Sequence, residues 1–283
     1  MQQKNIRKYF LFIIIGISSF LLNITNSSAR EIVNYNNIHM TQDEYSTLLN
    51  LGFTENQIYF MDEETYLNNK DLDATLISQT QRYYKTVSPL YGRSYTVEVS
   101  KDEYEKSDSQ NSIKGTVNTY YKTVVSTIAQ NGNKYRYNVS TLWKNMPSTR
   151  SFDVIGIGFA DSVYINSSVY FSFTYADHYG NYTTSTQYYN KKSTSTGGSA
   201  VYKLPSSSIA SLSANLYYDV SKNTSNTITS LSICGDYSHA QSTVSQSNVS
   251  DYGIGIYGIS LGPTLAAHYD EIPCAMEYAS VNW

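Results

Sequence analysis

The sequence carries little charge and shows no excess of basic residues. Only 15% of its 283 residues are charged, and 20 Lys and Arg stand against 23 Asp and Glu. Because a nucleic-acid-binding protein needs a basic field to attract phosphates, this balance argues against a nucleic-acid partner. With 41% hydrophobic residues, the chain is too apolar for intrinsic disorder, and its length suits one large domain or two small ones.

Strong enzyme motifs are also scarce. We expect no α/β-hydrolase elbow, no zincin motif and no P-loop. Gly253-x-Gly255-x-x-Gly258 imitates a dinucleotide-binding loop, but isoleucines alternate with these glycines and no helix is expected after them. This pattern predicts a strand that approaches another backbone closely. No cluster of Cys and His residues has metal-ligand spacing, so we expect neither a cofactor nor a metal.

The first thirty residues predict a secretory signal peptide. Three basic residues precede an apolar run over residues 9–24, and Ala29 supplies the small side chain that a signal peptidase requires. We expect residues 1–29 to be removed and the mature chain to be extracellular, either secreted or retained at the cell surface. An uncleaved membrane anchor through residues 9–24 is the alternative, although a span takes roughly 20 apolar residues.

The expected export of the chain bears on the state of its two cysteines, Cys234 and Cys274. Thiol pairs in an oxidising compartment are more often bridged than reactive, so the sequence predicts one disulfide. A bridge that closes a loop of about 40 residues stabilises a domain by roughly 3 to 4 kcal/mol on the chain-entropy model. Two buried free thiols are the alternative.

Residues 30–74 are expected to form a small three-helix module. Capping boxes begin at Thr41 and Thr54, and Asp62 precedes two further acidic residues, so three helix N-termini follow one another. A segment this short rarely buries enough apolar surface to be stable alone. The module is therefore expected to pack against the rest of the chain or against a partner.

Residues 75–283 predict an antiparallel β-sandwich. Apolar and polar residues alternate over Val163–Tyr175, which is typical of one half-buried strand. Asn131–Asn133 and His178–Asn181 are turn signals for hairpins, and a third hairpin is expected around Lys222–Ser225. The absence of long helical patterns between the strands favours sequential antiparallel pairing.

Two short features of this region stand out. The segment Tyr-Tyr-Lys-Thr-Val occurs at Tyr83–Val87 and again at Tyr120–Val124. The repeat either records a duplication or arises by chance, because the strands of this chain are rich in Tyr and Thr. The charged stretch Glu98–Asn111 is expected to be a solvated loop.

Tyrosine is the residue type that favours a binding function. The chain has 29 Tyr against 9 Phe and 2 Trp, and tyrosine rings stack on sugars or fill interfaces at a modest entropic cost. A Tyr doublet in a strand places one ring on each face. We expect a non-enzymatic binding module for a protein or glycan ligand, with Tyr84, Tyr121 and Tyr189 among its contacts. Alternatively, these rings only cover an outer sheet face.

A second group of candidate binding residues lies near the cysteines. Asp236-x-x-His239 and His268-x-Asp270 would converge if the disulfide holds their segments together. Such a cluster offers acid–base chemistry, so a hydrolase that uses His239 and His268 is a further alternative. The structural alternative is that these are hydrogen-bonded polar residues at strand ends.

A β-hairpin pore-forming toxin-like protein is another alternative. Each strand of such a hairpin needs about 9 to 11 residues with one apolar face, and Val163–Tyr175 meets this requirement. The expected partner strand, Tyr182–Tyr189, would place hydroxyl groups against lipid. Without pore formation, membrane contact is limited to the signal segment.

Several blocks of the sequence resemble a group of exported proteins of Gram-positive bacteria that have no assigned activity. The blocks are Leu51–Met61, Tyr83–Lys85, Trp143–Gly156 and Tyr237–His239, and together they touch most of the mature chain. The resemblance implies a bacterial exported protein, and it brings no substrate or catalytic residue.

Overall fold

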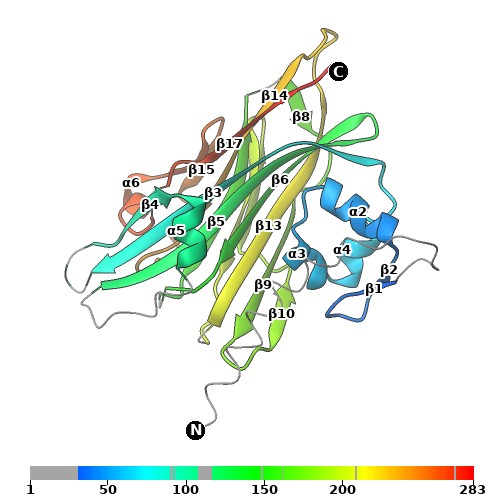
Figure 1. Ribbon diagram of the computed structural model, residues 1–283. Helices are drawn as coiled ribbons and strands as arrows, with labels where there is room; N and C mark the ends of the chain where they lie inside the picture. The colour runs from blue at the N-terminus through cyan, green and yellow to red at the C-terminus, as the bar shows by residue number, and fades with distance from the viewer. Residues whose placement is uncertain are drawn as a thin grey trace.

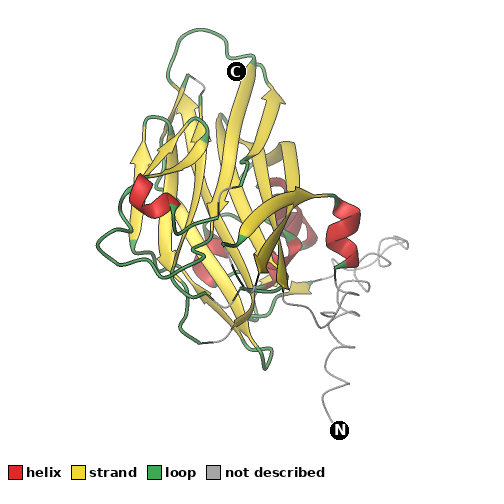
Figure 2. Ribbon diagram, turned by 90° about the vertical axis from the view of Figure 1, so that its left-hand side faces the viewer, coloured by secondary structure: helices red, strands yellow, loops and turns green. Residues whose placement is uncertain are grey.

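The computed structural model describes residues 31–89, 91, 93–107, 117–147, 149–160, 162–207, 209–270 and 272–283. The predicted signal peptide, residues 1–29, lies outside this range. Strands dominate the described residues, and the helices lie at the periphery (Figure 2). The prediction of a mainly β chain with antiparallel sheets is confirmed. In the described residues, no helix is both long and apolar enough to cross a membrane.

Figure 1 shows the helices and strands in their order along the chain. The helices are α2 (Gln42–Asn50), α3 (Glu55–Tyr59), α4 (Glu63–Leu67), α5 (Lys101–Lys106) and α6 (Pro263–Ala266). The strands are β1 (Ile32–Val33), β2 (His39–Met40), β3 (Ala74–Pro89), β4 (Tyr95–Val99), β5 (Val117–Asn131), β6 (Lys134–Trp143), β7 (Phe152–Phe159), β8 (Val163–Ile165), β9 (Tyr170–Asp177), β10 (Tyr182–Ser185), β11 (Asn190–Thr194), β12 (Gly197–Lys203), β13 (Ile209–Lys222), β14 (Ser230–Ser238), β15 (Tyr252–Gly255), β16 (Gly258–Leu261) and β17 (Ala275–Ser280).

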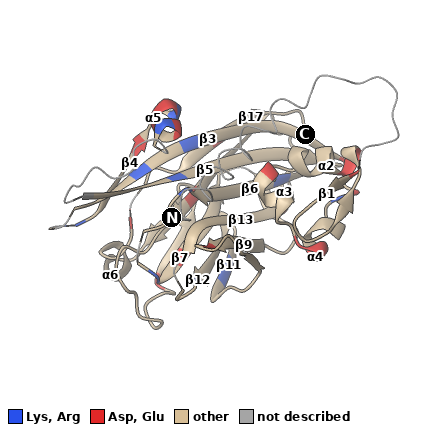
Figure 3. Ribbon diagram, turned by 60° about the horizontal axis from the view of Figure 1, so that its bottom comes forward, with Lys and Arg blue, Asp and Glu red and all other residues tan. Residues whose placement is uncertain are grey.

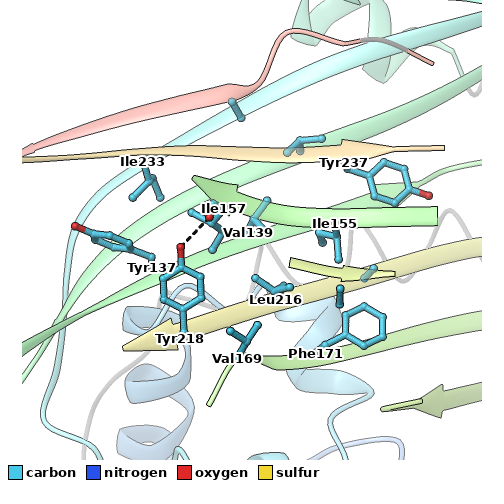
Figure 4. Packing of buried hydrophobic residues seen from close by; sticks show 14 of the residues in the cluster. Tyr137, Val139, Ile155, Ile157, Val169, Phe171, Leu216, Tyr218, Ile233 and Tyr237 are labelled. Atoms are coloured by element: carbon cyan, nitrogen blue, oxygen red, sulfur yellow. Dashed lines mark hydrogen bonds between the residues drawn. The ribbon is translucent and has the colours of Figure 1, made fainter. Parts of the chain in front are cut away.

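Two antiparallel sheets share one apolar core. The larger sheet has the order β10-β9-β13-β6-β5-β3-β4 with β8 beside β13, and the smaller has the order β11-β12-β7-β14-β17. Val139 and Leu216 of the larger sheet pack with Ile155 of the smaller one in a single buried cluster (Figure 4). The Tyr218 hydroxyl donates a 2.8 Å hydrogen bond to the Ile157 carbonyl across the layers, so even the polar tip of this buried ring is satisfied.

Two of the three expected hairpins are present. β5 and β6 join at Gly132, where φ is +59°, and β9 and β10 join at Gly180, where φ is +86°. The prediction of a hairpin around Lys222–Ser225 is wrong, because the strands on either side of it belong to different sheets. β13 pairs with β6, β8 and β9, whereas β14 pairs with β7 and β17. Both strands bury apolar residues, and the chain crosses from one sheet to the other between them.

The strand expected over Val163–Tyr175 is also interrupted. β8 and β9 pair with different parts of β13, and the Ser167 hydroxyl accepts a 2.9 Å hydrogen bond from the Asp219 amide between them. The hairpin that follows has strands of 8 and 4 residues. These are shorter than the roughly 9 to 11 residues per strand that a membrane-spanning hairpin needs. The single long strand over Val163–Tyr175 that supported the pore-forming alternative is therefore not formed.

The N-terminal helices begin where the capping boxes predict. The Thr41 and Thr54 hydroxyls accept amide hydrogen bonds of 3.2 and 3.3 Å, and Asp62 caps the next helix. These short helices form a small apolar cluster that also includes Tyr217 of β13. The Phe53 ring lies 5.4 Å from the Tyr217 ring, and the Asn69 side-chain amide donates a 3.0 Å hydrogen bond to the Tyr217 hydroxyl, so the helical segment is anchored on the larger sheet (Figure 1).

The C-terminal segment fastens the two sheets together. The predicted disulfide between Cys234 and Cys274 is present, with Cα atoms 5.6 Å apart, and it closes a loop over a separation of 40 residues. The Tyr84 hydroxyl donates to the Pro273 carbonyl at 2.7 Å, and the Ser126 hydroxyl donates to the Ala275 carbonyl at 2.6 Å. β3 and β5 of the larger sheet are therefore joined to the segment that leads into β17.

The glycine-rich segment forms a hairpin, β15–β16, that lies on the smaller sheet. A Cβ atom at Gly158 of β7 would come within 1.7 Å of the Gly255 carbonyl oxygen, so the two backbones touch. This contact confirms the prediction of a strand with close backbone approach.

Candidate functional site

A cleft of about 520 Å³ lies between α5 and the face of β3 and β5 that is turned away from the core. Its volume falls in the range of about 300 to 1,000 Å³ that small-ligand sites occupy. Tyr84 and Lys122 point into the core, so the next residue of β3, Lys85, and the preceding residue of β5, Tyr121, point outward, where they lie opposite each other. The cleft is lined by Lys85, Val87, Ser100, Asp102, Glu103, Lys106, Thr119 and Tyr121.

Helix α5 is fixed over the cleft by packing and capping. The Ser100 hydroxyl accepts the Glu103 amide at 3.2 Å, and the buried ring of Tyr104 lies 5.0 Å from Tyr83 and 6.3 Å from Tyr121. The Lys144 ammonium donates to the Tyr104 carbonyl at 2.7 Å. The stretch expected to be a solvated loop, Glu98–Asn111, thus contains a helix, and the spacing of Ser100 and Glu103 was the signal for its start.

Basic and acidic residues both line the cleft. Figure 3 shows acidic and basic residues together on α5. Lys85 forms an ion pair with Glu103 of α5, and this hydrogen bond raises the pKa of the Lys85 ammonium. Lys106 lies 4.0 Å from Asp102 on the same helix. Two basic and two acidic side chains therefore cancel in formal charge.

The inner face of the same strands carries a buried ion pair. Lys122 of β5 pairs with Asp270, and both side chains are 0% exposed. The Lys122 ammonium also lies over the rings of Trp143 and Tyr237, 4.7 and 5.0 Å from their centres. Asp270 accepts the His239 amide at 2.6 Å, so its charge is held by hydrogen bonds as well as by the lysine.

A second buried carboxylate, Asp153 of β7, lies beside this pair. His239 Nδ1 is 3.0 Å from Asp153 Oδ1, and the Tyr237 hydroxyl donates to Oδ2. The Ala240 amide adds a hydrogen bond of 3.2 Å. No described residue forms a hydrogen bond with His239 Nε2, and the imidazole is fully buried. The His239–Asp153 pair is therefore inaccessible to a substrate.

Asp236 lies under the β15–β16 hairpin. Its Oδ2 accepts the Ile259 amide at 2.9 Å, while Oδ1 has no hydrogen-bond partner among the described residues. Burial is the main cause that raises the pKa of the Asp236 carboxyl to about 6. The charged form of this side chain is therefore disfavoured in the folded protein.

The structure joins two of the four polar candidates by a hydrogen bond, since the amide of Asp270 donates to the His239 carbonyl at 3.0 Å. Asp236 is hydrogen-bonded to the Ile259 amide. His268 instead ends the turn after α6, and its Nδ1 is 2.6 Å from the Ser242 hydroxyl at the surface. The hydrolase that would use His239 and His268 is therefore not assembled.

The tyrosine candidates have three different environments. Tyr84 is fully buried, so it belongs to the core and is not available to a ligand. Tyr189 is half-exposed, and its ring lies 5.3 Å from Phe152. Of the three, Tyr121 lines the cleft, and the charged residues around it were missed because their convergence depends on the pairing of β3 with β5.

One motif contradicts the expectation that the chain has no hydrolase elbow sequence. Gly258-Ile259-Ser260-Leu261-Gly262 has the Gly-x-Ser-x-Gly spacing. In the structure, however, Ser260 lies within β16 opposite Gly253, rather than on a strained turn. No histidine of the described range is hydrogen-bonded to its hydroxyl, so the spacing builds no activated nucleophile here.

Comparison with known proteins gives little further guidance. No protein-family model and no curated protein matches the sequence. A solved structure described as "Pore forming protein" is similar, with 10% sequence identity and a TM-score of 0.25, over 59% of this chain and 83% of that chain. A likeness at this level carries no inference about function.

Proposed function

We propose that this chain is an extracellular, non-enzymatic binding protein, and that the cleft between α5 and strands β3 and β5 is its ligand site. The observation that carries the proposal is the position of Tyr121 in a cleft of about 520 Å³, next to the Lys85–Glu103 ion pair. An aromatic ring beside fixed polar groups is the usual composition of a recognition site.

The disulfide and the predicted signal peptide support an extracellular location. Disulfides persist in oxidising compartments and are rare in the cytosol. The Cys234–Cys274 bridge joins β14 to the segment before β17, and its Cys234 side chain is fully buried while Cys274 is partly buried.

The distribution of acid–base groups supports binding rather than catalysis. His239 and its carboxylate neighbours lie in the core, where no substrate reaches them. In the cleft, Glu103 is paired with Lys85, and Asp102 is its neighbour on a helix, so the two carboxylates diverge. Neither arrangement provides the facing carboxylates of a glycosidase.

The proposal is tested by screening the mature protein on glycan and surface-protein arrays, together with Tyr121→Ala and a matched control, Tyr188→Ala. Tyr188 is 49% exposed and lies outside the cleft. We expect the wild type and the control to bind the same ligand and Tyr121→Ala to lose at least about tenfold in affinity, or ~1.4 kcal/mol. Ligand binding that is unchanged in Tyr121→Ala, or no binding to any array, would contradict the proposal.

A further inference from the structure

The lining of the cleft indicates a class of ligand. We propose, on the basis of the binding function above, that the cleft takes a neutral oligosaccharide with one sugar ring stacked on Tyr121 in the cleft and a second on Tyr95, an exposed ring of β4 outside the cleft lining. The proposal rests on the charge balance of the lining, its hydroxyl and carboxylate groups, and the spacing of the two tyrosines.

The charge balance disfavours ionic ligands. The two lysines and two acidic residues of the lining cancel, and Lys85 already has Glu103 as its partner. A phosphorylated or sulfated ligand would meet Glu103 and Asp102, and a polycation would meet the lysines. A ligand without net charge avoids both repulsions.

The polar groups match the hydrogen bonds of a sugar. Lys85 and Lys106 are donors, Glu103 and Asp102 are acceptors, and the hydroxyls of Ser100 and Thr119 act as both; these side chains line the cleft together. Val87 is the aliphatic residue of this lining. An apolar peptide or a lipid would leave the charged groups desolvated and unpaired, which is costly.

The tyrosines are spaced for more than one sugar ring. Tyr95 of β4 is opposite Val87, and Tyr121 of β5 is opposite Lys85, so both rings belong to the outer face of the sheet. The two tyrosines are two strands apart and two residues out of register, which separates their Cα atoms by about 12 Å at ordinary strand spacing. Both act electrostatically on Lys85, and Tyr95 is 55% exposed. An oligosaccharide, rather than a single sugar, spans this distance.

The test is calorimetric titration of the mature protein with neutral tetrasaccharides of glucose, mannose and N-acetylglucosamine, and with a sulfated oligosaccharide and polyphosphate as charged probes. We expect a neutral tetrasaccharide to bind more tightly than its monosaccharide. Its affinity should change less than about twofold between 0.1 M and 1 M salt, because neutral ligands are not screened.

Four variants locate the binding. Tyr121→Ala should weaken it at least about tenfold and Tyr95→Ala about threefold or more, whereas Tyr121→Phe should keep it within about threefold because the ring remains. Tyr278→Ala is the matched control, since Tyr278 is 64% exposed on β17 of the smaller sheet.

The outcomes separate the two proposals. Tyr121-dependent binding of a charged probe or of an array protein would overturn the neutral oligosaccharide and leave the cleft as the binding site. Oligosaccharide binding that is insensitive to Tyr121 and Tyr95 would show that the cleft is not the site. Absence of Tyr121-dependent binding to any probe or array would overturn both proposals.

Discussion

The two faces of the β3–β5 pair use the same residues in opposite ways. The repeated segment places Tyr84 opposite Lys122 on the inner face and Lys85 opposite Tyr121 on the outer face. Because neighbouring residues of a strand point to opposite sides, the antiparallel register gives each face one Tyr–Lys pair. The inner pair lies in the core, and the outer pair lies in the cleft.

The two ion pairs differ in how far their side chains are exposed to solvent. The Lys122 side chain is 0% exposed and is paired with an equally buried Asp270, whereas Lys85 is 28% exposed and is paired with a 43% exposed Glu103. Buried charges depend on every partner that compensates their desolvation, while exposed pairs exchange with water at little cost. The inner face therefore determines stability, and the outer face is free to serve recognition.

The largest effect is expected from Lys122→Met. The substitution leaves the Asp270 carboxylate buried without its counter-charge, which costs about 3 to 5 kcal/mol of the free energy of unfolding. Urea denaturation at neutral pH measures this cost. The double variant Lys122→Met/Asp270→Asn should recover a large part of it because no buried charge is left uncompensated. Equal losses in the single and double variants would contradict the buried ion pair.

Asp236→Asn should have a pH-dependent effect. The Asp236 pKa is raised from 3.8 to about 6 by burial, so between these values the folded state holds a proton that the unfolded state releases. The free energy of unfolding therefore falls as the pH rises through this window, by at most about 3 kcal/mol, and the cost is fully present above it.

The side-chain amide that this substitution introduces is uncharged, and its oxygen can still accept the hydrogen bond from the Ile259 amide. We therefore expect Asp236→Asn to be the more stable protein at about pH 8 and equal to the wild type at about pH 4. Urea denaturation at the two pH values measures the difference. A stability difference of the same size at both would show that the carboxyl group does not titrate in this window.

Features that depend on a few adjacent residues were predictable from the sequence. The hydroxyls at Thr41 and Thr54 cap their helices, and the turn at Gly132 joins β5 to β6, because each depends on groups within three residues. The disulfide followed from the number of cysteines and the expected compartment.

Features that depend on long-range pairing were not predictable. The alternation in Val163–Tyr175 continues through the break between β8 and β9, which is visible only in their pairing with β13. Asp153 and Lys122 were missed because their partners lie 86 and 148 residues away along the chain. Their residue types alone would have suggested exposed positions.

A smaller effect on the free energy of unfolding is expected from removing one tyrosine hydroxyl on each face of the β3–β5 pair. Tyr84→Phe leaves the Pro273 carbonyl without its buried donor, which costs about 1 to 2 kcal/mol of the free energy of unfolding. Tyr121→Phe should cost less than about 0.5 kcal/mol, because its ring lines an open cleft where water replaces a lost partner. Thermal and urea denaturation of both variants compare the two faces directly, and equal losses would show that Tyr121 is a core residue.

A small effect on stability is also expected from Lys85→Met, the outer counterpart of Lys122→Met. Lys85 and Glu103 are partly exposed, so the loss of their pair should cost less than about 1 kcal/mol of the free energy of unfolding, and less still at high salt. The same substitution leaves Glu103 as a free acceptor in the cleft, so it should change ligand binding more than stability. Denaturation and ligand titration of this one variant separate the two properties. A stability loss comparable to that of Lys122→Met would mean that α5 is held to the sheet by this ion pair rather than by Tyr104, and the division between a structural inner face and a recognition outer face would fail.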